Sequence, residues 1–143
     1  MNKIIKIAVD AMGGDGSPKK IIDGIIHHFK NNENSFYQIF GDKDKILENI
    51  KSDLPRTCFE VIHTFPDIPD DTSQQAQLIE DAIAARPAAI LLAPTHPSAL
   101  DESILKIRKA EIPFVYFVSS SENVQADTFV GSNNLWVFSS NSS

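Results

Sequence analysis

The sequence predicts an α/β fold of about five mostly parallel strands with helices on both faces of the sheet. Short apolar runs alternate with segments of helical periodicity almost throughout the 143 residues. The links between these segments are short, and the apolar run 88–93 is continuous, as in strands buried on both faces. This alternation is typical of a three-layer arrangement, Rossmann-like or flavodoxin-like.

The first expected strand covers 4–9 and leads through a glycine-rich loop into a helix over 18–30. Apolar residues recur at helical spacing in this second segment. Ser17 is the expected N-cap, and Pro18 occupies the first helical position.

Further along, a strand over 36–40 is closed by Gly41-Asp42, and a short helix over 44–52 leads to a third strand over 58–63. The pattern Thr72-Ser73-Gln74-Gln75 predicts a capping box that opens a helix running to Arg86.

The second half continues with the strand over 88–93 and a helix over 99–110. Two more strands are expected over 114–118 and 128–130, the last one short. Residues 1–138 are predicted to form a single α/β domain, and the polar residues 139–143 a disordered tail.

Composition narrows the functional classes. A formal net charge of −6 argues against nucleic acid and acidic membranes as partners, because both require a basic surface. Neither a membrane span nor a secretory signal is predicted, and a cytoplasmic location is expected. The lone Cys58 excludes an internal disulfide and argues against a metal site. No cofactor is expected.

The loop after the first strand is the main candidate site. Glycines there expose backbone N–H groups at a helix N-terminus, where an anion such as phosphate is favoured. The alternative is a tight turn whose carboxylates cap backbone donors. Lys19 and Lys20 favour an anion, because cations in the first turn otherwise oppose the helix dipole. The residues expected to bind the anion are Asp10, Gly13, Gly14, Asp15, Gly16 and Lys19.

Ligands of parallel sheets bind beyond the carboxyl ends of the strands. His63 ends the third expected strand and is the catalytic candidate, as a general base, although the sequence shows no partner for it.

Composition changes near residue 57. Residues 1–56 carry a formal charge of +1, from nine basic and eight acidic residues, whereas residues 57–143 carry −7, from four basic and eleven acidic residues. We interpret this change as a junction of two sequence origins inside one sheet, at about 57–71.

The first 63 residues resemble the bacterial phosphate acyltransferase family, which makes acyl-phosphate from acyl-(acyl carrier protein) for phospholipid synthesis. The motif is Lys6-Ile7-Ala8-Val9-Asp10-Ala11-Met12-Gly13-Gly14-Asp15, followed by Phe40-Gly41-Asp42. This resemblance implies phosphate or acyl-phosphate as a ligand. The family's enzymes are more than twice as long as this chain, so a complete active site is not expected.

Residues 59–134 resemble the amino-terminal lobe of periplasmic sugar-binding proteins. The resemblance rests on fragments such as Ala89-Ile90-Leu91-Leu92-Ala93-Pro94 and Ala110-Glu111-Ile112-Pro113, in which Glu111 stands where the family usually has glycine. It implies a simple sugar as a ligand, with Thr95, His96 and Ser119 as possible contacts.

Three functional hypotheses follow. The chain is a truncated or chimeric acyltransferase-like protein that keeps an anion site, a half-lobe of a sugar-binding protein, or a folded chimera without activity of its own. Autonomous catalysis is not expected in any of them.

Overall fold

The computed structural model of the chain describes residues 3–13, 16–64, 72–94, 98–117, 119–121 and 123–130. Within these residues the strands are β1 (Ile5–Asp10), β2 (Ser35–Gly41), β3 (Phe59–His63), β4 (Ala89–Leu92), β5 (Phe114–Phe117) and β6 (Thr128–Val130). The helices are α1 (Lys19–Asn31), α2 (Lys43–Ile50), the short 3₁₀ helix η1 (Arg56–Cys58), α3 (Thr72–Ala84) and α4 (Asp101–Lys109).

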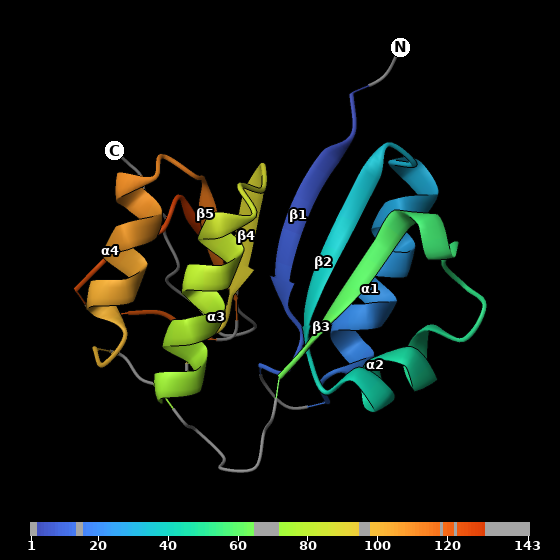
Figure 1. The fold of residues 1–143 in the computed structure, drawn as a ribbon, viewed down its shortest axis with the longest axis horizontal. Coiled ribbons are helices and arrows are strands. Elements are labelled where there is room, and N and C mark those ends of the chain that lie inside the picture. The colour runs from blue at the N-terminus through green and yellow to red at the C-terminus, as the bar shows by residue number, and fades with distance from the viewer. Residues whose placement is uncertain are drawn as a thin grey trace.

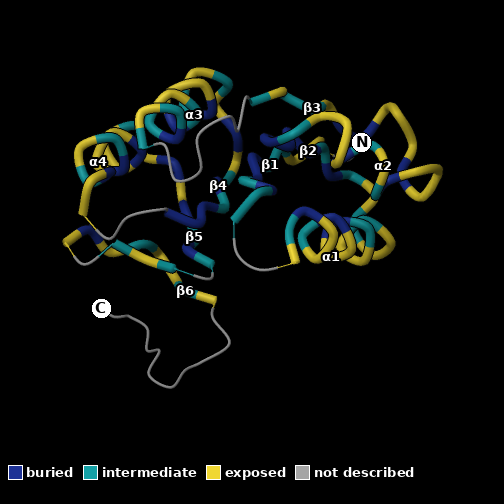
Figure 2. The backbone as a smooth tube through the Cα atoms, turned by 90° about the horizontal axis from the view of Figure 1, so that it is seen from below, coloured by how far each residue is buried: buried dark blue, intermediate teal, exposed yellow. Residues whose placement is uncertain are grey.

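The described strands form one six-stranded sheet in the order β3-β2-β1-β4-β5-β6. Every pairing is parallel. Helices α1 and α2 lie on one face, whereas α3 and α4 lie on the other (Figures 1 and 2). The predicted three-layer α/β class is therefore confirmed, with six strands rather than about five.

Each face of the sheet has its own apolar cluster, because successive side chains of a strand point to opposite faces. Val9, Tyr37 and Ile39 pack beneath α1 and α2. Ala8 and Phe40 pack with α3 and α4 on the other face. Figure 2 shows this burial as dark segments concentrated in the strands between the two pairs of helices.

Three local predictions need correction. Ser17 does not cap α1, because its hydroxyl donates to the Gly13 carbonyl within the loop, and Pro18 occupies the N-cap position. Cys58 is buried as expected, but it belongs to η1 rather than to β3. Helix α3 ends at Ala84, because Arg86 adopts a left-handed φ of 51°. The expected tail, 139–143, lies outside the described residues.

Candidate functional site

The carboxyl ends of β1 and β4 form the topological switch point of the sheet. From β1 the chain passes through α1 to β2 on one side, while β4 pairs with β1 on the other side. The connections therefore diverge at these two strands, and ligands of open α/β sheets bind at this position. Asp10 ends β1 here, and Ala93 directly follows β4.

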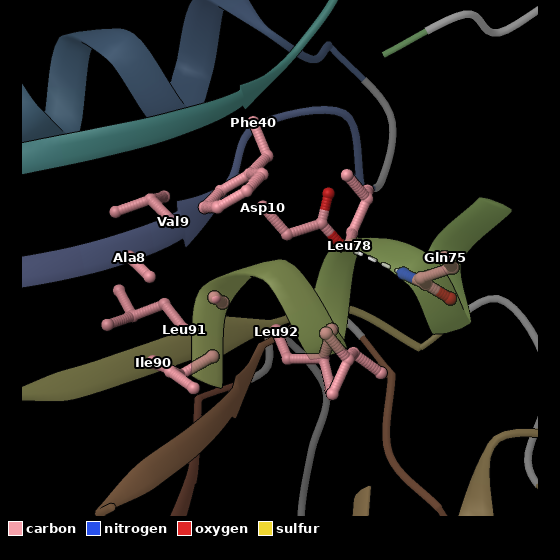
Figure 3. A pocket seen from close by; sticks show the side chains of 11 residues that line it. Ala8, Val9, Asp10, Phe40, Gln75, Leu78, Ile90, Leu91 and Leu92 are labelled. Atoms are coloured by element: carbon pink, nitrogen blue, oxygen red, sulfur yellow. Dashed lines mark hydrogen bonds between the residues drawn. The ribbon is translucent and has the colours of Figure 1, made fainter. Parts of the chain in front are cut away.

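The Asp10 carboxylate points into the seam between β1, β4 and α3. Its Oδ1 accepts from the Met12 amide at 3.3 Å. Its Oδ2 accepts from Gln75 Nε2 at 2.9 Å and from the Ala93 amide at 3.3 Å. Figure 3 shows the Asp10 and Gln75 side chains directed toward each other. Burial raises the pKa of Asp10 above its ordinary value, and these three donors oppose the rise.

The two described glycines of the loop have different roles. A Cβ on Gly13 would lie 2.2 Å from the Cβ of Ala93, so the absent side chain lets the loop cross directly over the end of β4. Gly16 has a φ of +82°, which glycine adopts without strain. The aliphatic part of Lys20 lies against Gly16 and covers this end of the loop.

The N-terminus of α1 is joined to the loop by a backbone hydrogen bond, from the Lys20 amide to the Gly16 carbonyl at 3.1 Å. It has no side-chain cap and no acidic residue in its first turn. Lys19 is exposed, and its Nζ pairs with Asp23 of the next turn at 2.7 Å. Lys20 is therefore the first-turn lysine whose side chain follows the loop.

The N-terminus of α2, in contrast, is capped by two side chains. Asp42 Oδ1 accepts from the Lys45 amide at 3.2 Å, and His63 Nδ1 accepts from the Lys43 amide at 3.0 Å. A ring nitrogen that accepts a hydrogen bond carries no proton, so the other nitrogen of neutral His63 is the protonated one. His63 lies at the end of β3, with β2 between it and β1.

Serines after β5 connect neighbouring elements. Ser119 Oγ donates to the Pro94 carbonyl at 2.6 Å and so joins the segments that follow β5 and β4. Ser121 Oγ donates to Asp101 Oδ1 at 2.5 Å, at the start of α4. Both hydroxyl protons are thus directed toward protein acceptors.

Four predicted site residues lie outside the described residues. They are Gly14 and Asp15 of the loop, and Thr95 and His96 after β4.

A small cavity lies between α3 and the sheet, with Asp10 and Gln75 among its lining residues. Its volume is about 20 Å³, which is close to the minimum of about 10–15 Å³ that one water requires. The rest of its wall is apolar, from residues such as Ala8, Phe40 and Ile90. The cavity is therefore large enough for one water molecule but too small for a sugar or an acyl chain.

Sequence reasoning missed the role of Gln75. The capping pattern placed it at the start of a helix, but its amide nitrogen also donates to the Ala93 carbonyl at 2.8 Å. Gln75 and Asp10 are 65 positions apart, and no local pattern reports a contact over that distance.

Among the described residues, no three His, Cys, Asp or Glu side chains come close enough together to hold a metal ion. None of the helices in the same part of the chain is long and apolar enough to cross a membrane.

Comparison with protein families gives two different matches. The sequence model of the family described as "Periplasmic binding protein domain" matches residues 29–137. The N-terminal region is similar to phosphate acyltransferases. It is 72% identical over 64 residues to the one from Pelagibacter ubique, a match that covers 45% of this chain and 19% of the relative.

The phosphate acyltransferase of Listeria innocua is 39% identical over 67 residues, which are 47% of this chain and 19% of that protein. The chain thus spans about a fifth of the length of the curated relatives that it matches.

Solved structures with a similar fold are named as sugar-binding proteins or transporters. A sugar transporter from Clostridium phytofermentans has a TM-score of 0.60 and 21% identity, over 90% of this chain and 39% of that one. A sugar-binding protein of an ABC transporter from Bacillus halodurans has a TM-score of 0.58 and 22% identity, over 92% and 36%. At this identity the likeness concerns the fold.

Proposed function

Since the chain belongs to the periplasmic binding protein domain family, we propose that it is a ligand-binding module rather than an autonomous enzyme. The ligand is a small phosphate-type anion, inorganic phosphate or an acyl-phosphate, bound in the loop between β1 and α1. The similarity of the N-terminal region to phosphate acyltransferases supports this choice of ligand. Acyl transfer itself is not proposed, because the chain spans only 19% of those enzymes.

The inward orientation of Asp10 is the observation that carries the proposal. A carboxylate facing the loop would repel phosphate, but both Asp10 oxygens accept hydrogen bonds within the protein. The carboxylate is thereby directed into the protein, and three N–H donors offset part of its charge. Gly13 and Gly16 then lie at the N-terminus of α1, which no side chain caps and where the helix dipole favours an anion.

Two first-turn lysines complete the proposed site. Lys20, whose side chain lies against Gly16, opposes the helix dipole in the absence of an anion and becomes a favourable partner when an anion binds at the loop. Lys19, whose Nζ pairs with Asp23, adds a second positive charge to the same turn. Gly14 and Asp15 belong to the same proposed loop. Inorganic phosphate is the simplest probe of all these residues.

Amide resonances of labelled protein test the proposal. On titration with millimolar phosphate, we expect the Gly13 and Gly16 amides to shift and saturate, whereas chloride at equal ionic strength leaves them in place. Lys20→Gln removes a charge beside Gly16 and weakens binding about two- to fivefold. The matched variant Lys30→Gln, in the last turn of α1, leaves the affinity unchanged. Unmoved glycine amides reject the anion site.

A simple sugar is the second candidate ligand, favoured by the family and by the named sugar-binding neighbours. Its contacts would be Thr95, His96 and Ser119, beyond β4 and β5. Ribose and arabinose are suitable probes, and in this case the amides of 119–121 shift instead of those of the glycines. If neither ligand class shifts any amide or raises the melting temperature, the chain is a folded chimera without binding activity.

A further inference from the structure

Gln75 joins the carboxyl ends of the two strands at the switch point. Its Nε2 donates to Asp10 Oδ2 at 2.9 Å and to the Ala93 carbonyl at 2.8 Å. An amide nitrogen carries two protons, so it can make both bonds at once. The residue is only 6% exposed, so water does not readily replace these partners.

The Asp10 carboxylate extends this connection to the loop. Its Oδ2 accepts from Gln75 and from the Ala93 amide, while its Oδ1 accepts from the Met12 amide. The next residue, Gly13, passes so close to Ala93 that a Cβ would not fit. The beginning of the loop is therefore fixed by hydrogen bonds and by contact with the end of β4.

The two ends of this connection come from different parts of the chain. Asp10 and Met12 belong to the N-terminal region that is similar to phosphate acyltransferases. Gln75 lies in α3, within the residues that match the periplasmic binding protein domain. The geometry of the start of the loop thus depends on a helix that the acyltransferase-like region does not contain.

We propose that Gln75 is a positioning residue for anion binding: through Asp10 it fixes Met12 and Gly13, at the start of the loop after β1, in the conformation that presents the Gly13 backbone to the ligand. This inference rests on the proposed function. Gln75 itself does not contact the anion. Its removal is expected to disturb the Met12 and Gly13 amides first and ligand affinity as a consequence.

Two leucine variants on the same helix test this role. Gln75→Leu removes both N–H donors and keeps a side chain of similar size. Gln77→Leu is the matched control, because the exposed Gln77 donates only outward, to Asp81 at 3.0 Å. We expect Gln75→Leu to shift the Met12 and Gly13 amides, to accelerate Met12 amide exchange, and to weaken phosphate binding at least fivefold. Gln77→Leu should do none of these.

The proposal would be overturned if the Met12 and Gly13 amides of Gln75→Leu kept their wild-type chemical shifts and exchange rates. It would also be overturned if these amides were perturbed but the Kd for phosphate was unchanged. If Gln75→Leu fails to fold, Gln75→Asn decides, because its shorter amide should loosen Met12 in a folded protein. Absence of phosphate binding by the wild type would reject the proposed function alone. In that case the amide measurements, which need no ligand, would still show whether Gln75 fixes Met12 and Gly13.

Discussion

Asp10 and Gly13 illustrate how single residues of the candidate site also hold the fold together. Both were predicted from a glycine-rich pattern as parts of an anion site. In the structure, Asp10 connects β1 to Ala93 and Gln75, and Gly13 gives the loop its close approach to Ala93. These structural roles lie where a ligand is proposed to bind, because the switch point is both the seam of the sheet and the position at which open α/β sheets bind ligands.

Replacement of Gly13 by alanine should destabilise the protein. The new Cβ would lie 2.2 Å from the Ala93 Cβ, and such overpacking costs about 1–3 kcal/mol. The free energy of unfolding in urea measures this loss. Gly24→Ala is the matched control: nothing lies within 4 Å of its added Cβ, and in an exposed helix it should stabilise by about 0.5–1 kcal/mol.

A second substitution tests the cause of the Gly13 effect. Ala93→Gly removes the methyl group with which the new Cβ collides, so the double variant should recover most of the stability lost by Gly13→Ala. A double-mutant cycle gives the coupling energy directly. Additive effects of the two substitutions would show that the close approach to Ala93 is not the source of the strain.

At the scale of elements, the ends of the helices are the most informative features. Helix α4 ends in a Schellman motif: the Ile112 amide donates to the Ile107 carbonyl, and the Glu111 amide to that of Arg108. Glu111 has a φ of 59°. Glu111, which stands where the resembled sugar-binding family usually has glycine, thus occupies the position directly after the C-cap Ala110.

Glu111→Gly should therefore stabilise the protein by up to about 1 kcal/mol, because glycine adopts the left-handed conformation without strain. Chemical unfolding checks the gain. Glu111→Ala serves as the control: it removes the same negative charge from the helix C-terminus but retains a Cβ, so it should gain only a few tenths of a kcal/mol. Equal gains in the two variants would attribute the effect to charge rather than to backbone conformation.

For the whole molecule, the notable feature is the central position of β1. It pairs with β2 in the acyltransferase-like region and with β4 in the following part of the chain. The two apolar clusters lie on opposite faces of the sheet, and each contains residues of β1. We therefore expect the two regions to unfold together.

Fluorine labels on the two tyrosines of the chain can test this cooperativity. Tyr37 packs in the cluster beneath α1 and α2, whereas Tyr116 packs in the cluster with α3 and α4. Because one sheet joins the clusters, their ¹⁹F signals should disappear with the same urea midpoint and slope. Tyr37→Phe assigns the signals. Separate midpoints would mean that the two regions are independent folding units.

The elements were largely predictable from the sequence. The six strands and four α-helices of the described residues agree with the predicted segments to within a few residues, because hydrophobic periodicity is a local property of the chain. The errors occur at loops and helix ends, as at Ser17 and Arg86. At these positions the residue at which a helix begins or ends depends on which carbonyl or amide group the folded loop brings near. The local sequence does not indicate which group that is.

The sequence by itself therefore determined the class of fold, the glycine loop with its carboxylate and lysines, and the resemblance to two families. Tertiary structure alone decided that Asp10 faces inward, that His63 caps α2 through the Lys43 amide, and that Gln75 joins the ends of β1 and β4. The physical reason is the separation along the chain over which each effect acts. Periodicity and turn chemistry act over a few residues, whereas the orientation of a buried polar group depends on partners that the chain brings back from as far as 83 positions away.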